Sequence, residues 1–590
     1  MRHASLFPVG LRRDTGGNVL PIAAIGVLVA VIVVGSAVDL SRSYLARQQI
    51  QAACDAAVLA GRRTVTSNGF DTAAQNAAGN YFQANFSDDT QGTHGTGFDA
   101  SSPDDGNTVV GTARTVVDTL LMRVFGHDST TITVTCASSM GVGNADVMMV
   151  LDTTGSMNST LSRSQTRIQA LRAAMKNFYA TMTSATASTN ARIRYGFVPY
   201  SSSVNVGRLL MDLDPSYIVD RRTYQSRQYK VDTSSSTTSS WEQGSKSYST
   251  ENACNSAKLA NETDYKDYGS GSNKTQRMYE YKCQKVSTGR FSSAWFIFSR
   301  YSERRYEYVY GPVEWPTSVY KTFAATTTPT GDYGANVSST WSGCIIERST
   351  VAQATFSYSS LTGISPKEAY DLDIDSPPES SSDATKWAPL WPEVAFRRWD
   401  DNGYTRSTTR DGDTAPSPCP TRARVLSEMS ESEFNAVANS LVPDGNTYLD
   451  IGMIWGGRMI SPDGIFSEVV NEEPDNGGEV SRHIIFMTDG VMEPNNIIQQ
   501  AWGMEFWDRR VTSDGSSGDA ARHTSRFLAS CEAIKNKGIR VWVVAFTSGL
   551  SNDLKTCASD SSSFTANSAK ELNTAFQEIA KQVGELRVIE

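Results

Sequence analysis

A long uncharged stretch lies near the start of the chain. Residues 19–38 (VLPIAAIGVLVAVIVVGSAV) contain no charged side chain. A helix of this length, at about 1.5 Å per residue, spans the roughly 30 Å hydrocarbon core of a bilayer. Gly35 and Ala37 also resemble a signal-peptide cleavage pattern, but the apolar run is longer than is usual for a signal. We therefore expect a retained transmembrane helix after a short cytoplasmic N-terminus, residues 1–18. Under either reading, the bulk of the chain lies outside the cytoplasm.

The next segment is rich in helix formers. Residues 39–63 contain no proline and many Ala, Leu, Arg and Gln side chains, so the membrane helix is expected to continue as a stalk. Periodicity then predicts a helix over 72–86, strands over 108–117 and 130–136, and a short helical turn over 120–125. Residues 39–143 are therefore predicted to form a stalk and a small α+β, pilin-like unit.

From residue 144 the pattern changes to alternating strands and helices. Apolar strands are predicted over 145–152, 193–198, 482–488 and 539–546, and helices over 167–181, 431–441, 525–537 and 569–586, with a further helix opening at Thr447. This alternation predicts a doubly wound, mostly parallel sheet with helices on both faces, and hence an α/β fold.

Oxygen-bearing side chains follow the first of these strands. Asp152, Thr154 and Ser156 stand at alternate positions in LDTTGSM. Ligand groups gather beyond the carboxyl ends of strands in open α/β sheets, and hard oxygen donors suit Mg²⁺, Mn²⁺ or Ca²⁺. The alternative is that these residues only cap helices, which Asp, Ser and Thr often do.

The strand ending in Asp152, the loop at Thr447 and the strand ending in FMTDG together resemble the von Willebrand factor type A (vWA) domain. That resemblance implies a metal-ion-dependent adhesion site formed by Asp152, Thr154, Ser156, Thr447 and Asp489. It implies direct ligation by the three hydroxyls, with the two carboxylates acting through water. Thr154 replaces a serine of the family pattern and keeps the hydroxyl. Mg²⁺ is the expected ion, and Mn²⁺ or Ca²⁺ are the alternatives.

Spacing indicates an insertion within this domain. Ser156 and Thr447 are 291 residues apart, and the interval 208–425 is rich in Ser, Thr, Tyr and Trp with little helical periodicity. Removing these 218 residues leaves 73 between the two positions, so 144–207 and 426–590 are predicted to form one vWA domain. We expect the insertion to be β-rich. We expect it to be a recognition surface, as loops on rigid scaffolds often are, and the alternative is a spacer or a partly disordered segment.

The N-terminal segment carries a second resemblance. GGNVLPIAAIGVLVAVIVVGSAVDLSRSYLARQQIQAACDAAVLAG is similar, over residues 10–65, to the N-terminal module of TadE/TadG-type proteins of the tight-adherence (Flp) pilus system. Ile22 stands where a prepilin peptidase site counted from Gly17 has Glu, which argues against processing as a major pilin. The alternative is a generic membrane anchor with an Ala-rich stalk.

Eight cysteines divide among the predicted units. Pairing within units predicts Cys54–Cys136 and Cys531–Cys557, and leaves three possible pairings among Cys254, Cys283, Cys344 and Cys419. Free buried thiols are the alternative. The motif DLDIDS, with Asp371, Asp373 and Asp375, imitates the start of a calcium loop but has Ser382 where the bidentate Glu belongs, so a solvated acidic loop is predicted instead.

Composition limits the function. There are 54 Lys and Arg against 63 Asp and Glu, which argues against a nucleic-acid partner. Five histidines and the absence of G-x-S-x-G, Walker A and H-E-x-x-H motifs argue against an enzyme.

Two functions remain from different classes. We expect a bacterial single-pass membrane protein, with most of its chain periplasmic or extracellular, that serves pilus assembly or adhesion. Its partner would be a protein that offers an acidic group to the metal, in the pilus machinery or on a surface ligand. The alternative is a surface hydrolase, or an accessory subunit of one, with its active site in 208–425.

Overall fold

The computed structural model describes residues 19–65, 69–103, 108–139, 143–162, 165–187, 191–399, 405–407, 414–516, 519–547, 549–583 and 587–589. The fold mixes helices and sheets, and the chain divides into two compact units. The first contains the residues up to Gly143 together with 182–191 and 581–590, and the second contains 144–181 and 192–580. The expected cytoplasmic segment, residues 1–18, lies outside the described residues.

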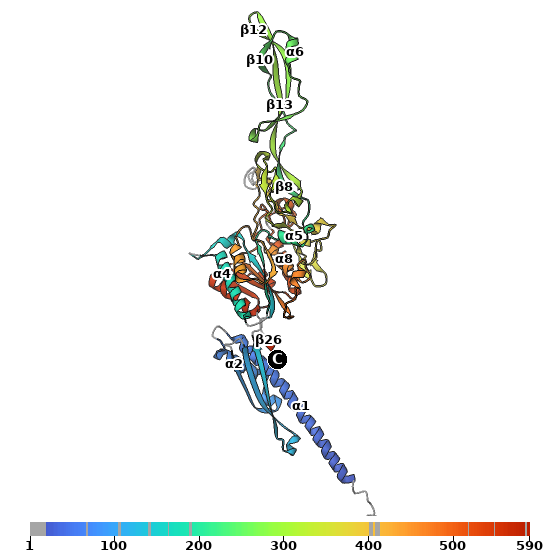
Figure 1. Cartoon of the computed structure of the whole chain (residues 1–590), viewed down its shortest axis with the longest axis vertical. Helices are drawn as coiled ribbons and strands as arrows, with labels where there is room; N and C mark the ends of the chain where they lie inside the picture. The colour runs from blue at the N-terminus through green and yellow to red at the C-terminus, as the bar shows by residue number, and fades with distance from the viewer. Residues whose placement is uncertain are drawn as a thin grey trace, which may run out of the picture. The chain divides into compact units, whose positions relative to one another are not determined.

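A single 46-residue helix, α1 (Val19–Thr64), runs through the first unit (Figure 1). Its N-terminal part has a mean hydropathy of 2.7 and is almost entirely exposed, so by length and composition it can cross a membrane. Its C-terminal part has a buried face that includes Ala46, Ile50 and Cys54. The predicted stalk is therefore helical and continuous with the apolar run.

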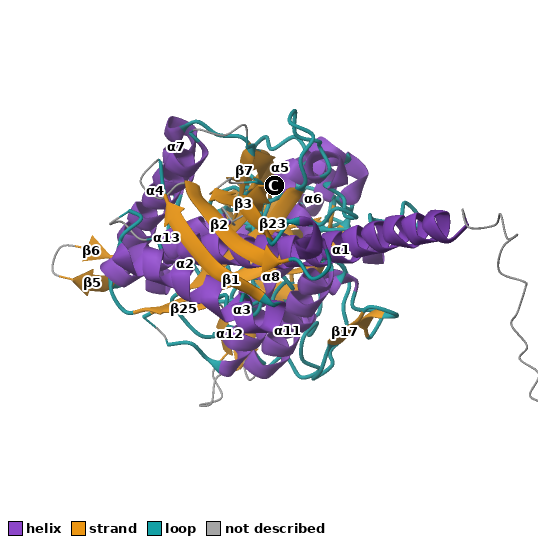
Figure 2. Cartoon of the chain, turned by 90° about the horizontal axis from the view of Figure 1, so that it is seen from below, coloured by secondary structure: helices purple, strands orange, loops and turns teal. Residues whose placement is uncertain are grey.

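The rest of the first unit packs on this buried face. Helix α2 (Thr72–Asn85) begins at Asp71, whose carboxylate accepts the backbone N–H groups of Ala73 and Ala74. Strands β1 (Thr93–Ser101), β2 (Thr108–Asp118) and β3 (Ser129–Ser139) form an antiparallel sheet, in which β1 and β2 run side by side (Figure 2). Strand β26 (Arg587–Ile589) pairs with the free edge of β3. The disulfide Cys54–Cys136 joins α1 to β3, as predicted.

A six-stranded sheet forms the centre of the second unit. Its order is β22 (Arg424–Ser427), β7 (Ile193–Tyr200), β4 (Asn144–Asp152), β23 (Val480–Thr488), β24 (Arg540–Phe546) and β25 (Ser563–Ala566). The five strands from β7 to β25 are parallel, and β22 is antiparallel to β7. All nine residues of β4 are buried, as expected for a strand covered on both faces.

Helices pack on both faces of this sheet. On one face lie α8 (Leu449–Ile460) and α11 (Ala520–Asn536), whose apolar residues join Met148 and Val150 of β4 in the core. On the other face lie α4 (Arg167–Thr186) and α13 (Ala569–Val583). Phe178 of α4 makes edge-to-face ring contacts with Tyr195 of β7 and Phe576 of α13.

The interval between β7 and β22 has two parts of different character. The first is an arm of antiparallel strands, green in Figure 1, of which β12 and β13 are the longest: β8 (Arg222–Val231), β9 (Thr237–Thr238), β10 (Glu242–Tyr248), β11 (Lys266–Tyr268), β12 (Thr275–Gly289) and β13 (Ser292–Trp315). The second runs from 316 to 423, and its described residues form short strands, single turns of 3-10 helix and loops. Its side chains Trp341, Trp387 and Trp391 are buried in the same core as α8 and α11. Because β22 begins at Arg424, the sheet resumes two residues before the end of the interval 208–425.

The prediction of a solvated acidic loop at 371–375 is wrong for Asp371. Its carboxylate is fully buried, pairs with Arg526 of α11 and accepts the indole N–H of Trp502 at 2.8 Å. Nearby, Glu347 pairs with Arg458 of α8 at 2.8 Å. Buried charges need such partners, so these pairs fix the 316–423 segment to the helices of the core. Sequence could not reveal the partners because they lie more than 100 residues away.

Candidate metal site

Asp152 is the last residue of β4 and is completely buried. Its Oδ1 accepts the backbone N–H of Thr154 at 2.9 Å and the Thr154 hydroxyl at 2.6 Å. This local turn, in which an Asp side chain bonds the backbone two residues on, bends the chain away from the strand. It brings the Thr154 and Ser156 hydroxyl oxygens to within 2.9 Å of each other.

Asp489 approaches the same loop from the neighbouring strand. It follows β23, and its Oδ1 accepts the Ser156 hydroxyl at 2.7 Å. Since β4 and β23 are parallel neighbours, their carboxyl ends meet at one edge of the sheet. A continuous chain of contacts therefore joins Asp152, Thr154, Ser156 and Asp489, four of the five residues implied by the vWA resemblance.

Thr447 reaches this edge through the backbone of its loop. The N–H of Gly155 donates to the carbonyl of Gly445 at 2.9 Å, and the N–H of Asp444 donates to the carbonyl of Thr153 at 2.8 Å. Gly445 has a φ of +82°, and a Cβ there would meet Pro418 and Ser202 at under 3 Å, so the loop requires glycine at this position. On the other side, a Cβ at Gly490 would lie 3.7 Å from Thr447 Oγ1. Thr447 thus lies beside the residue that follows Asp489.

Three further side chains complete the surroundings. Thr488 donates its hydroxyl to Asp152 Oδ2 at 2.8 Å, and the Tyr200 hydroxyl lies 3.4 Å from the same oxygen. Arg167, at the start of α4, donates to Asp489 Oδ2 at 2.8 Å. Strand order could have suggested Tyr200, because it ends β7 in register with Asp152. Nothing in the sequence distinguishes Arg167 from the other basic residues.

The carboxylates of Asp152 and Asp489 are both buried, at the same edge of the sheet. Burial raises the pKa of Asp152, and the negative charge of Asp489 raises it further, to about 6. Burial, followed by the charge of Asp152, also raises the pKa of Tyr200 well above its ordinary value, so that its hydroxyl stays protonated. Arg167 pairs with Asp489 but is itself a quarter exposed. Because Arg167 neutralises only one of the two carboxylates, a second positive charge beside Asp152 would be stabilised.

The hydroxyl protons give an independent reason why a cation fits. Thr154 donates its only proton to Asp152, and Ser156 donates its only proton to Asp489. The two hydroxyl oxygens lie within hydrogen-bond distance of each other, 2.9 Å apart, and each still has lone pairs that can bind a cation. Carboxylate and hydroxyl oxygens are the donors that Mg²⁺, Mn²⁺ or Ca²⁺ prefers. Among the described residues no three or more His, Cys, Asp or Glu side chains are arranged to hold a metal, so an ion here depends on the hydroxyls.

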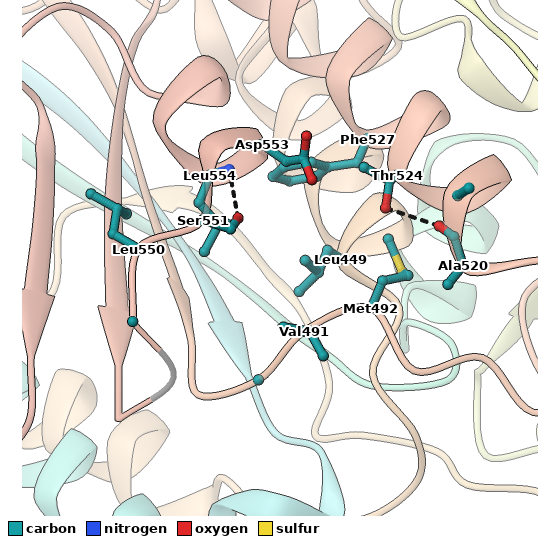
Figure 3. Close-up of a pocket in the computed structure, with 13 residues that line it drawn as sticks. Leu449, Val491, Met492, Ala520, Thr524, Phe527, Leu550, Ser551, Asp553 and Leu554 are labelled. Atoms are coloured by element: carbon teal, nitrogen blue, oxygen red, sulfur yellow. Dashed lines mark hydrogen bonds between the residues drawn. The ribbon is translucent and has the colours of Figure 1, made fainter.

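A mostly apolar pocket of about 480 Å³ begins directly after Asp489 (Figure 3). Leu449, Val491, Met492 and Phe527 supply much of its wall, and Asp553 lies at its rim. Its volume is in the range of ordinary ligand sites. Because Gly490 lines the pocket, a group bound there lies next to the candidate metal site.

Comparison with known proteins gives a family for the N-terminal segment. Residues 17–79 match the family model described as "Putative Flp pilus-assembly TadE/G-like". The resemblance expected over residues 10–65 is therefore confirmed for this part of the chain. No curated protein matches the chain significantly.

Solved structures give only distant likenesses. One is the pilus adhesin SpaC from Lactobacillus rhamnosus GG in an open conformation, with 10% identity and a TM-score of 0.28, over 83% of this chain and 33% of that one. Another is proximal thread matrix protein 1 from the mussel byssus with a zinc-occupied MIDAS motif, with 14% identity and a TM-score of 0.16, over 33% of this chain and 35% of that one. The chain thus spans about a third of the length of the adhesin it matches.

Proposed function

We propose that this chain is a membrane-anchored pilus-assembly or adhesion protein that holds a partner through a divalent cation. The anchor is the apolar run 19–38, within the segment that matches the TadE/G-like family. The bulk of the chain lies on the periplasmic or extracellular side. The second unit is a vWA domain, whose strand order with one antiparallel edge strand suits a doubly wound sheet carrying 208–425 as an insertion.

One observation carries the metal proposal: the chain of oxygen atoms that runs from Asp152 through Thr154 and Ser156 to Asp489. In the proposed site these four residues and Thr447 hold Mg²⁺, with Mn²⁺ or Ca²⁺ as alternatives. Ligation by neutral hydroxyls leaves the ion with positive charge to share. A carboxylate on the partner then supplies the missing ligand.

The pocket beside Gly490 suits the rest of such a partner segment. Its Leu, Met and Phe side chains bury apolar groups next to the acidic one, while Val491 remains 65% exposed at its edge. Burial of an apolar anchor beside a charged contact is a common source of affinity at protein interfaces. We therefore expect the partner to present an acidic residue flanked by apolar ones.

The first experiment measures Mn²⁺ binding to the full chain in detergent by electron paramagnetic resonance. Asp152→Asn is expected to abolish specific binding because it removes the buried negative charge and keeps the side-chain shape. Asp444→Ala is the matched control, since its exposed carboxylate lies in the adjoining loop and is expected to leave binding unchanged. Equal Mn²⁺ affinity in Asp152→Asn and the natural chain would reject the site.

Partner capture tests the adhesion role. The full chain is used to retrieve ligands from pilus-bearing cell envelopes with Mg²⁺ and again with EDTA. Retention that depends on Mg²⁺ and is lost in Asp152→Asn is expected. If neither EDTA nor Asp152→Asn changes the amount of partner that is retained, metal-dependent binding is refuted.

A further inference from the structure

The connection between β2 and β3 carries an unusual number of exposed apolar side chains. Within seven residues, Leu120 is 55% exposed, Leu121 40%, Val124 78% and Phe125 38%. The core of the first unit is formed by α1, α2 and the sheet without these side chains. Clustered apolar surface of this kind typically marks an interaction site.

This connection is fixed to one turn of α1. The Asp39 carboxylate accepts the backbone N–H groups of Leu120, Leu121 and Met122 at 2.8, 3.0 and 2.8 Å. Ser36 donates its hydroxyl to Met122 Sδ at 3.1 Å. A Cβ at Gly35 would lie 2.9 Å from Leu121 Cβ, so glycine permits this close approach.

The turn at 35–39 is also the end of the apolar run. A helix entering the hydrocarbon at Val19 reaches its far boundary, about 30 Å away, close to Val38. The exposed band of α1, which includes Val33 at 62% and Val34 at 60%, leads directly to the connection. Arg42 follows one turn later and donates to the carbonyl of Asp118 at 3.0 Å, at the level expected for lipid headgroups.

We propose that residues 120–126 form a second membrane contact, which inserts Leu120, Leu121, Val124 and Phe125 into the interfacial layer of the bilayer beside α1. The proposal rests on the membrane anchoring by 19–38 proposed above. Lipid is the occupant because the patch continues the lipid-facing surface of the helix and is bordered by Arg42 and Arg123. Two contacts instead of one fix the rotation of α1 about its own axis, so that a defined face of the first unit meets the membrane.

Site-specific fluorescence tests this proposal in the full chain. All eight native cysteines are in disulfides, so an introduced cysteine is the only free thiol. An environment-sensitive dye is attached at Val124→Cys, and the protein is reconstituted in phosphatidylcholine vesicles that contain spin-labelled lipids. Leu28→Cys reports the membrane helix, and Tyr81→Cys, exposed on α2, reports the aqueous phase.

Spin labels near the headgroups are expected to quench the dye at position 124 more strongly than spin labels at the bilayer centre do. The dye at 28 is expected to show the reverse order, and the dye at 81 no quenching. Adding Val124→Asp to a dye at Phe125→Cys is expected to remove most of the quenching there.

Each contrary result has a distinct meaning. Quenching at 28 without quenching at 124 overturns the second contact and leaves the anchor. No quenching at either position overturns the anchor as well. A dye at 124 that is shielded from both aqueous iodide and lipid spin labels indicates a protein neighbour and also rejects the lipid contact.

Discussion

At the scale of single residues, the candidate site depends on charge buried at one edge of the sheet. Asp152 accepts the Thr154 hydroxyl and Asp489 accepts the Ser156 hydroxyl, and the partly buried guanidinium of Arg167 offsets part of the charge of the two carboxylates. Arg167 thus pairs with the Asp489 oxygen that does not accept the Ser156 hydroxyl. Its charge is expected to oppose an incoming cation.

Removing Arg167 is therefore expected to tighten cation binding. Arg167→Ala should lower the Kd for Mn²⁺ by about tenfold, as for the loss of a partly screened unit charge several ångström from the ion. Titration calorimetry in low salt measures the change. Lys176→Ala, two turns further along α4, is the control and should have little effect. A weaker site in Arg167→Ala would instead mean that Arg167 organises Asp489 for the ion.

Two buried histidines are expected to differ in protonation at neutral pH, with His523 charged and His483 neutral. Burial alone would lower the pKa of His523, but the carboxylates of Asp450 and Asp519 raise it to about 9. Burial, aided by Arg540, lowers the pKa of His483 to about 4. Because the chain has only five histidines, NMR of the imidazole carbons can follow each one. Neither His523 nor His483 should titrate between about pH 5 and 8.

The two pKa shifts make the free energy of unfolding depend on pH in opposite directions. The pKa of His523 is above its unfolded value of about 6.5, so its contribution is complete below that pH and is lost as pH rises through about 9. The pKa of His483 is below the unfolded value, so its contribution is complete above about pH 6.5 and is lost as pH falls through about 4. The free energy of unfolding should therefore fall on both sides of neutrality. A His523 signal that titrates near 6.5 would contradict this account.

Part of the candidate metal site could be predicted from sequence, because Asp152 and Asp489 lie at the ends of strands with a recognisable apolar pattern. The motif LDTTGSM places Asp152, Thr154 and Ser156 on one loop, and the parallel pattern places FMTDG at the same edge. Arg167 and Thr488 could not be inferred as partners, since their contacts depend on how α4 and β23 meet in space. The buried position of Asp371 was missed for the same reason.

At the scale of elements, glycines decide how closely helices approach. A Cβ on Gly61 of α1 would lie 2.9 Å from the Ala78 Cβ of α2, which is closer than real side chains come. Gly79 lies in the middle of α2 with nothing within 4 Å of an added Cβ. The two glycines therefore have different reasons to be present, although both occur in helices.

The same substitution is expected to act in opposite directions at these two positions. Gly61→Ala should destabilise the first unit by about 1–3 kcal/mol through overpacking against α2. Gly79→Ala should stabilise it by about 0.5–1 kcal/mol, because alanine is the better helix former and no contact opposes it. Amide hydrogen exchange of α2 in the full chain measures both. Equal effects would mean that helix propensity, and not helix–helix contact, controls this unit.

Periodicity predicted several of the long elements to within a few residues and missed the shortest ones. The expected helix over 72–86 is α2, and the expected strands over 108–117 and 130–136 are β2 and β3 within two or three residues at either end. Strands β22 and β25 have only four residues each and were not predicted, since so short a run has no measurable period. Their positions are determined by the sheet edge beside which they lie.

At the scale of the whole molecule, the interval 208–425 combines a part that lies outside the core of the second unit with a part that belongs to it. The arm is stabilised by side chains stacked across its strands, such as Arg277 over Tyr301 at 4.2 Å and Lys282 over Trp241 at 4.4 Å. Its outer part, 233–304, contributes no residue to the core that contains α8 and α11. The 316–423 segment contributes many, including three tryptophans.

Deleting the outer arm is therefore expected to leave the second unit folded. Asp232 and Arg305 face each other across the hairpin, so an Asn-Gly turn can join them in place of 233–304. The shortened chain should bind Mn²⁺ with unchanged affinity and unfold cooperatively in urea. Deletion of 316–423 is the contrasting variant and should prevent folding. Loss of Mn²⁺ binding on arm removal would show that the arm supports the site.

The four disulfides have a consequence for how the chain forms its native bonds. The bonds Cys54–Cys136, Cys254–Cys283, Cys344–Cys419 and Cys531–Cys557 join consecutive cysteines, and no loop encloses or crosses another. If the polypeptide is delivered from its N-terminus, each cysteine meets its native partner as the next thiol to emerge. An oxidant that pairs thiols in order of arrival thus yields the native set directly, and maturation should need no disulfide isomerase to correct it.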